Sequence, residues 1–371
     1  MKVAISGYYG CGNAGDEAVL AGIKEAFHKR AGDSVQLTAL SQNPAETEIL
    51  HKLPSVYRMN FKEVKATLKE SQLLISGGGS LLQDSTSFKS LLYYLGVVKL
   101  AQNMRVPVMF YAQGMGPLRR PLSQTLVRMV ANRVQAISVR DEASATLLKK
   151  IGVVRPPIEV TADPAFGLPL APKSATLKLW EREGLSLDSR PKIGVALRPM
   201  GATEPFLIAQ YAKLLMELEA QSGAQVILIP MQTPGDVPLA QEIAQKTGRP
   251  DDFPVLSRAL PPIDLLNLMS HLDAVVAMRL HALIFAARVG ASPFALSYDP
   301  KVDNLMEALN LEDQKTHWRD FDPTEVANRV SWTLTEKTVV SHKLKEKALE
   351  LKQKAYRNAD IALELMRWKQ K

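Results

Sequence analysis

The 371-residue sequence has a single cysteine, Cys11, so it can form neither an intramolecular disulfide nor a cysteine cluster for zinc. This favours a reducing compartment, and we expect the cytoplasm. No apolar run approaches the roughly 18 to 20 residues that span a bilayer. The N-terminal residues also lack the basic leader and long apolar region of a secretory signal. Any membrane contact is therefore expected to be peripheral.

Several motifs that hold metals, cofactors or nucleophiles are also missing. We find no His-Glu-x-x-His, no Cys/His grouping, no P-loop and no Gly-x-Ser-x-Gly nucleophile elbow. We therefore expect no required metal and no bound cofactor. The 46 Lys and Arg exceed the 38 Asp and Glu, which gives a net charge of +8, but no basic-aromatic motif accompanies the surplus. Nucleic acid is therefore not the expected partner.

Length and hydrophobic pattern predict the fold class. The chain exceeds the roughly 250 to 300 residues at which a single core stops growing, so two domains are expected. Short β-rich apolar runs alternate with helical patterns, which predicts α/β domains with doubly wound parallel sheets. We expect strands at residues 2–6, 36–40, 73–76, 106–112, 136–139 and 159–161, then at 192–197, 225–230, 255–256, 274–277 and 293–296. The predicted domains are an N-terminal Rossmann-like domain over 1–170, a linker over 171–190, and a C-terminal Rossmann-like domain over 191–335.

Residues 336–371 form the last predicted part, a C-terminal amphipathic helix. Apolar residues recur there at three- and four-residue steps. From His342 onward the segment has nine Lys and Arg but only four Asp and Glu. This segment therefore holds +5 of the net charge of +8. Two explanations stay open: peripheral contact with an anionic membrane surface, or a solvated helix packed across both domains, which we favour.

Glycines and polar residues gather at four consecutive strand ends of the first domain. Such glycines expose amide groups to an anionic ligand, although a glycine turn can also serve packing alone. Because the carboxyl ends of parallel strands share one edge, we expect these residues to form one binding edge. The candidates are Gly10, Asn13, Gly15, Asp16 and Glu17, then Gly77, Gly78, Gly79, Ser80, Gln83 and Asp84, then Gln113 and Gly114, and finally Arg140.

The second domain places cations and a histidine at comparable positions. Arg279 and His281 lie where an apolar strand passes into a helix, so an anion there would meet backbone amides, guanidinium and imidazole together. Arg198 and Lys301 follow two other strands of this domain. The set suits a small anion that carries both phosphate and carboxylate. A lone histidine is more often structural, but this position makes His281 our candidate general acid or base.

Taken together, these segments resemble the polysaccharide pyruvyl transferase family, most closely its CsaB-type bacterial members. The resemblance rests on the Gly7–Glu17 segment, Ser76–Ser80, Gln113-Gly114, Ser138–Asp141, the Arg198 strand end and Met278–Ala282. It implies a GT-B-like fold of two Rossmann-type domains that face a cleft, the first on the acceptor side and the second on the donor side. A C-terminal helix that returns to the first domain is usual in such folds.

The resemblance also implies the reaction. The donor would be phosphoenolpyruvate, used as a co-substrate without metal, and the acceptor a sugar of a cell-wall or secreted polysaccharide. N-acetylmannosamine or another hexose, free or lipid-linked, would receive pyruvate as a cyclic ketal with release of phosphate. By this resemblance His281, Arg140 and Lys301 are catalytic, and Arg198, Arg279, Leu280, His281 and Lys301 bind the donor.

Two other classes of function stay open. One is a GT-B glycosyltransferase or sugar-nucleotide epimerase, because a fold alone does not determine chemistry. Asp299, Asp303 and Glu307 would then offer a carboxylate for a nucleotide ribose. The other is a non-catalytic glycan-binding component of a synthesis complex.

Overall fold

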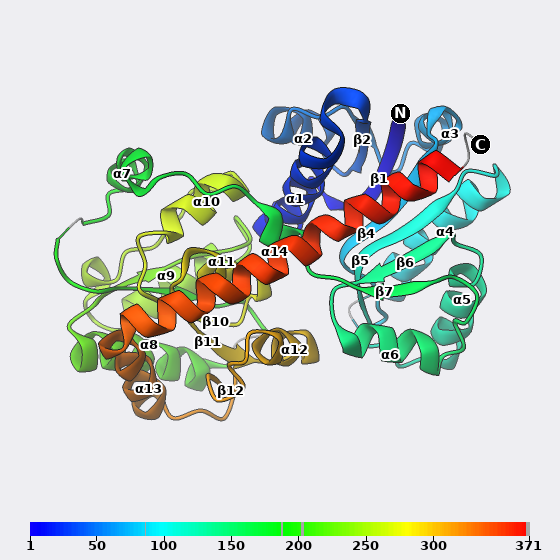
Figure 1. Cartoon of the computed structure of the whole chain (residues 1–371). Helices are drawn as coiled ribbons and strands as arrows, with labels where there is room; N and C mark the ends of the chain where they lie inside the picture. The colour runs from blue at the N-terminus through cyan, green and yellow to red at the C-terminus, as the bar shows by residue number, and fades with distance from the viewer. Residues whose placement is uncertain (86, 187, 202–203, 369–371) are drawn as a thin grey trace. The chain divides into compact units, whose positions relative to one another are not determined.

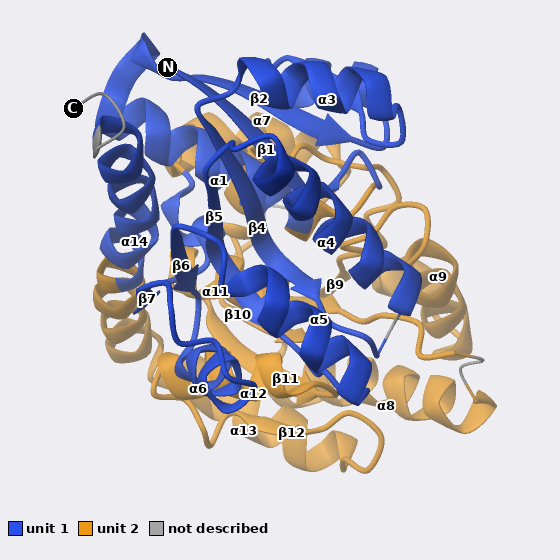
Figure 2. Cartoon of the chain, turned by 90° about the vertical axis from the view of Figure 1, so that its right-hand side faces the viewer, with its two compact units in different colours: residues 1–11, 16–168, 351–371 blue, residues 12–15, 169–350 orange. Residues whose placement is uncertain are grey.

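The computed structural model describes residues 1–85, 87–186, 188–201 and 204–368, which divide into two compact units. Unit 1 comprises residues 1–11, 16–168 and 351–371, and unit 2 comprises residues 12–15 and 169–350 (Figure 2). The division places the short Gly12–Gly15 segment with unit 2, although the chain on both sides of it belongs to unit 1. The predicted domain boundaries at 170, 190 and 335 stay predictions.

Unit 1 is built on a parallel sheet with the strand order β3-β2-β1-β4-β5-β6-β7 (Figure 1). Its strands are β1 (Lys2–Tyr9), β2 (Gln36–Ser41), β3 (Ser55–Tyr57), β4 (Leu73–Leu82), β5 (Val108–Met115), β6 (Ala136–Val139) and β7 (Ile158–Val160). Its helices are α1 (Ala14–Ala31), α2 (Pro44–His51), α3 (Phe61–Glu70), α4 (Phe88–Asn103), α5 (Pro121–Ala131) and α6 (Glu142–Lys150).

Alternate residues of these strands face two different hydrophobic cores, as the period of a strand requires. On β1, Val3 and Ile5 pack with α1 and with the last turns of α14 (Lys337–Trp368). Ala4, between them, faces the core formed by α3, α4, α5 and α6. Both faces of the sheet are therefore covered, which explains why its strands read as continuous apolar runs.

Unit 2 has a second parallel sheet, with the strand order β12-β11-β10-β8-β9. Its strands are β8 (Lys192–Ala196), β9 (Gln225–Leu228), β10 (Ala274–Ala277), β11 (Ser292–Ser297) and β12 (Lys315–His317). Its helices are α7 (Lys173–Arg182), α8 (Pro205–Ser222), α9 (Val237–Lys246), α10 (Pro262–Met269), α11 (Leu280–Val289), α12 (Pro300–Ala308), α13 (Pro323–Thr335) and the first turns of α14. Helices α8, α9 and α13 pack on one face of this sheet.

The predicted strands are present with three differences. β1, β4 and β5 continue past their predicted ends through irregular pairing, so Gly77–Gly79 and Gln113-Gly114 lie within strands and not in loops. The predicted strand at 255–256 is wrong, because Val255 forms only an isolated bridge with Leu228. The short edge strands β3 and β12 were not predicted.

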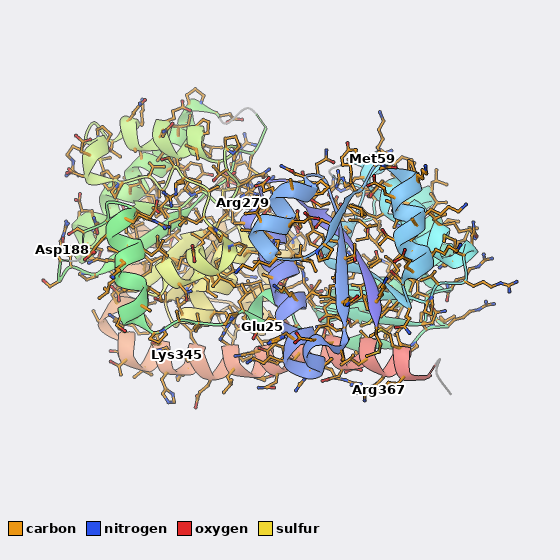
Figure 3. The ribbon with its side chains drawn as sticks, turned by 90° about the horizontal axis from the view of Figure 1, so that it is seen from above. Glu25, Met59, Asp188, Arg279, Lys345 and Arg367 are labelled. Atoms are coloured by element: carbon orange, nitrogen blue, oxygen red, sulfur yellow. The ribbon has the colours of Figure 1, made fainter. Side chains whose placement is uncertain are left out.

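The C-terminal segment is helical, as its periodicity predicts, from Lys337 to Trp368. Most of its apolar stripe is buried: Leu344, Ala348, Leu351, Ala355 and Ala362 are each at most 6% exposed, and Leu365 is partly buried. Lys345, on this helix, is labelled in Figure 3. Protein atoms therefore cover the stripe, which favours packing over membrane contact. Among the described helices, none is long and apolar enough to cross a membrane. Residues 369–371 of the predicted helix lie outside the described residues.

Candidate functional site

The glycine segment after β1 is anchored by a buried contact between Glu17 and His51 of unit 1. Glu17 accepts a hydrogen bond from the Gly10 backbone N–H through Oε1 (2.8 Å), and its Oε2 lies 2.8 Å from Nε2 of His51. The side chains of Glu17 and His51 are 8% and 3% exposed. Glu17 therefore holds the loop in place, and a contact with ligand stays a prediction for Gly10 and Glu17.

The glycines of β4 let α1 pack directly on the strand backbone. Gly77, Gly78 and Gly79 have φ values of 141°, 71° and 115°, which favour glycine. A Cβ on Gly78 would lie 2.1 Å from Cγ1 of Val19 on α1, and one on Gly79 would lie 3.3 Å from Oδ1 of Asp16. These three glycines therefore allow close packing of the backbone. Their role in ligand binding stays a prediction.

Arg140 joins the carboxyl ends of neighbouring strands in unit 1. Its Nη1 donates to Oδ2 of Asp163 (3.1 Å), and its Nη2 donates to the Ser80 hydroxyl (2.9 Å). A Cβ on Gly114 would lie 2.7 Å from that Nη2, so the guanidinium rests on the Gly114 backbone. The Arg140 side chain is only 6% exposed. The structure thus brings Ser80, Gly114 and Arg140 together, as the shared strand edge predicts.

The remaining polar candidates of unit 1 have structural partners. Gln113 is fully buried in β5 and donates through Nε2 to the carbonyl of Gly79 (3.0 Å). The Asp84 carboxylate accepts the backbone N–H groups of Arg119 (2.8 Å) and Arg120 (2.9 Å), which fixes the chain ahead of α5. Gln83, beside it, accepts a hydrogen bond from the Ser85 hydroxyl (2.6 Å).

The Gly12–Gly15 segment contacts the loop after β9 in unit 2. The Ala14 N–H donates to the Met231 carbonyl (2.9 Å), and Asn13 forms an antiparallel bridge with Gln232. The Asn13 side chain accepts the Gly15 N–H (2.9 Å) and so fixes the start of α1. A Cβ on Gly15 would lie 2.2 Å from Nδ1 of His281. The His281 ring therefore lies directly against the Gly15 backbone, which the Asn13 side chain holds in place.

The second-domain candidates follow three adjacent strands of unit 2. Ala196, Ala277 and Ala295 are register partners on β8, β10 and β11, with β10 in the middle. Arg198 comes two residues after Ala196, and Arg279 comes two residues after Ala277. Lys301 lies in the first turn of α12, directly after β11. The structure thus gathers these cations at one edge of the sheet, as predicted.

Arg279, labelled in Figure 3, is held by a carboxylate that sequence reasoning missed. Its Nε donates to Oδ2 of Asp236 (3.0 Å), and its Nη2 donates to Oδ1 of the same group. The Asp236 side chain is 1% exposed and also accepts the backbone N–H of Gln232 (3.0 Å). Nη1 of Arg279 has no hydrogen bond to any described residue, so one edge of the guanidinium is available for a ligand.

Arg198 and Lys301 meet at a tyrosine that was not among the candidates. Nη1 of Arg198 donates to the Tyr298 hydroxyl (2.8 Å), and the guanidinium lies 4.8 Å from the ring centroid. Nζ of Lys301 lies 5.3 Å from the same centroid. Burial raises the pKa of the Tyr298 phenol, but the positive charges of Lys301 and Arg198 lower it by more, so this pKa lies below its usual value.

The first turn of α11 completes this group. Arg279 is the N-cap of the helix, Leu280 is buried, and His281, a residue of intermediate burial, follows directly. The unsatisfied amides of a helix N-terminus favour an anion there. The structure therefore combines imidazole, guanidinium and helix amides, as the sequence predicts.

Sequence position offered some signal for the missed residues. Tyr298 lies three residues before the candidate Lys301. Asp163 comes shortly after β7, as Arg140 comes directly after β6. Asp236, in contrast, is 43 residues from Arg279, and nothing in the local sequence links them. Among the described residues, no group of three or more His, Cys, Asp or Glu could hold a metal ion. A metal-independent reaction stays a prediction.

Comparison with known proteins identifies the family. The family model described as polysaccharide pyruvyl transferase matches residues 13–300 of the chain. The chain belongs to the polysaccharide pyruvyl transferase family. The amylovoran biosynthesis protein AmsJ of Erwinia amylovora is 21% identical over 393 residues, which cover 90% of this chain and 92% of AmsJ. The predicted family is therefore confirmed, and with it a transferase.

Solved structures confirm the GT-B-like fold class of this pyruvyl transferase family member. UDP-GlcNAc 2-epimerase from Neisseria meningitidis superposes with a TM-score of 0.65 at 11% identity, covering 98% of this chain and 100% of the epimerase. Anabaena Alr3699/HepE, in complex with UDP and glucose, gives 0.62 at 17% identity and covers 98% of both chains. E. coli ADP-heptose LPS heptosyltransferase II gives 0.53 at 15% identity, covering 91% of this chain and all of the transferase. At such identities the likeness shows the fold alone.

Proposed function

We propose that this chain transfers the pyruvyl unit of phosphoenolpyruvate to a saccharide as a cyclic ketal and releases phosphate. The observation that carries the proposal is the group of cations in unit 2, where Arg198, Arg279 and Lys301 follow three adjacent strands. Phosphoenolpyruvate is a small anion with a phosphate and a carboxylate, and such groups are bound well by guanidinium pairs. The family of the chain supports the same donor chemistry.

The N–H groups of Arg198 and Arg279 that have no partner among the described residues are the ones we propose to bind phosphoenolpyruvate. Nε of Arg198 is buried and has no hydrogen bond to any described residue, and Nη1 of Arg279 has none either. We assign these donors to the phosphate and carboxylate of phosphoenolpyruvate. Asp236 keeps the Arg279 guanidinium oriented before the ligand arrives, which lowers the entropic cost of binding. The amides at the start of α11 and the Lys301 ammonium add positive charge.

His281 is the proposed general acid and base. Protonation of the methylene carbon of the donor makes its C2 atom oxocarbenium-like, and one acceptor hydroxyl adds to C2 while His281 takes its proton. The C2–O bond to phosphate then breaks, and phosphate leaves with the bonding electrons and with the proton held by His281. The second hydroxyl closes the ketal at C2. The packing of His281 against Gly15 holds the ring for these transfers.

The acceptor is proposed to bind the glycine-rich strand edge of unit 1. The polar groups of Asp16, Ser80 and Arg140, beside the backbone of Gly10 and Gly114, offer donors and acceptors for sugar hydroxyls. We propose N-acetylmannosamine or another hexose of a cell-wall or secreted polysaccharide, free or lipid-linked. The catalytic role predicted for Arg140 remains part of this proposal, with Asp163 as its orienting partner.

Two of the three carboxylates that would serve a nucleotide-sugar enzyme already have partners, and the third, Glu307, is exposed. Asp299 is the N-cap of α12 and pairs with Lys301 (3.5 Å), and Asp303 pairs with Lys315 (3.0 Å). Melting curves with phosphoenolpyruvate and with UDP-GlcNAc separate the two functions, because a ligand that binds the folded state raises the melting temperature. We expect a rise with phosphoenolpyruvate, and a rise with UDP-GlcNAc alone would refute the proposal.

A histidine substitution tests the mechanism. Replacement of His281 by Ala is expected to lower the rate of phosphate release by about 10²- to 10⁴-fold, since a general acid and base is lost, while calorimetry finds nearly unchanged phosphoenolpyruvate affinity. His342→Ala is the matched control, because His342 is 74% exposed on α14. Wild-type phosphate release by H281A, with acceptor present, would exclude His281 from catalysis.

A further inference from the structure

Protonation of a carbon atom requires an acid that the roles assigned above do not provide. Arg198 and Arg279 remain protonated in proteins and so do not act as acids. His281 already exchanges the proton of the acceptor hydroxyl with the leaving phosphate. The acid must therefore come from another group that lies among the donor-binding cations of unit 2.

The Tyr298 phenol has the required position and hydrogen bonding. Its oxygen accepts from Nη1 of Arg198 at 2.8 Å, and its ring lies against Arg198 and Lys301. The hydroxyl donates to no described residue, so its proton is not committed within the described protein. Two adjacent cations also stabilise the phenolate that remains after proton transfer.

We infer that Tyr298 is the acid that protonates the methylene carbon of the enolpyruvyl donor, an inference that rests on the proposed function. The O–H bond of Tyr298 breaks as a C–H bond forms at the methylene carbon, which becomes the methyl group of the ketal. The phenolate, held by Arg198 and Lys301, then takes the proton of the second acceptor hydroxyl as that oxygen bonds to C2. One hydroxyl proton thus leaves with phosphate through His281, and the other restores Tyr298.

Lys301 is the competing acid, because an ammonium group can also donate a proton. Its Nζ lies 3.5 Å from Oδ2 of Asp299, so the ammonium is already held in an ion pair beside the Tyr298 ring. The structure therefore favours a charge-stabilising role for Lys301 and an acid role for Tyr298. Lys301→Arg distinguishes the two, because it keeps the charge but replaces the ammonium by a group too weakly acidic to donate.

The test uses the full chain with phosphoenolpyruvate and an acceptor that the wild type turns over. Tyr298→Phe keeps the ring and removes only the hydroxyl, so we expect wild-type melting temperature and nearly unchanged phosphoenolpyruvate affinity by calorimetry. The kcat for phosphate release should fall by about 10²- to 10⁴-fold. The matched control is Tyr211→Phe, because Tyr211 is buried in the core of the same unit with its hydroxyl toward the Trp318 carbonyl (3.4 Å). It should turn over like the wild type.

Each alternative result has a separate meaning. If Y298F keeps kcat and loses phosphoenolpyruvate affinity, Tyr298 only positions the cations, and the inference is wrong. If K301R loses more of kcat than Y298F does, Lys301 is the acid, and the inference is equally wrong. If the wild type releases no phosphate with any acceptor while phosphoenolpyruvate binds nowhere, the proposed function fails and this inference fails with it. If the wild type turns over and kcat falls in Y298F but not in K301R, the result supports both the proposed function and the acid role of Tyr298.

Discussion

Replacement of Gly15 by Ala tests the contact that positions His281. Gly15 lies in the first turn of α1, and its backbone is compatible with alanine, but the new Cβ would lie 2.2 Å from Nδ1 and 2.7 Å from Cγ of His281. The imidazole must therefore move by about 1 Å or more. Overpacking of this kind costs about 1–3 kcal/mol, whereas alanine in a helix gains up to about 1 kcal/mol over glycine. We expect a net loss of stability of between about 0 and 3 kcal/mol.

A double-mutant cycle isolates this contact from the helix propensity. Urea denaturation of wild type, G15A, H281A and the double variant should give a coupling of about 1–3 kcal/mol, since alanine at 15 becomes harmless or stabilising once the imidazole is removed. Gly96→Ala on α4 is the control, because its Cβ meets no atom within 4 Å and should act equally in both backgrounds. When His281 is present, G15A should also slow phosphate release by about 10²-fold, because the new Cβ displaces the imidazole ring. Equal destabilisation by G15A with and without His281 would refute the reasoning.

Two further substitutions test buried carboxylates. Asp236→Asn removes the charged partner of Arg279 and should lower the free energy of unfolding by about 3–5 kcal/mol, measured by urea denaturation; a wild-type midpoint would contradict this pairing. Asp84→Asn concerns a carboxylate whose burial raises its pKa, but the hydrogen bonds from the backbone N–H groups of Arg119 and Arg120 lower it, so the pKa lies below its usual value. Its stabilisation is complete above the unfolded pKa of about 4 and is lost as the pH falls through the lower folded pKa. The difference in the free energy of unfolding between wild type and D84N should therefore become smaller as the pH falls into the acid range. A difference that does not change with pH would contradict the lowered pKa of Asp84.

The fold was predictable where burial leaves a pattern in the sequence. The inner strands of both sheets are buried along nearly their whole length, so they stand out as apolar runs, and β6 and β10 have their predicted bounds. β3 and β12 have only three residues each, too few for a pattern to show. The extension of β4 through Gly77–Gly79 was hidden, because positive φ values at glycine are typical of loops as well as of irregular strands.

The candidate site was predictable as a set of strand ends but not as a set of contacts. Arg198, Arg279 and Lys301 reach one edge because parallel strands end together, and this follows from the order of elements alone. The partners of these cations depend on which strands are neighbours. Asp236 meets Arg279 across β8, and Tyr298 meets Arg198 across β10, so both contacts need the sheet order that local sequence does not contain.

The most direct test of the central claim is mass spectrometry of the product. The chain would be incubated with phosphoenolpyruvate and a panel of amino-sugar acceptors, free and lipid-linked, while phosphate release is recorded. We predict an acceptor that gains a pyruvate ketal in equal amount to the phosphate released, with the ketal lost in H281A. Phosphate release without a ketal, or transfer of sugar from UDP-GlcNAc in place of pyruvate, would contradict the account.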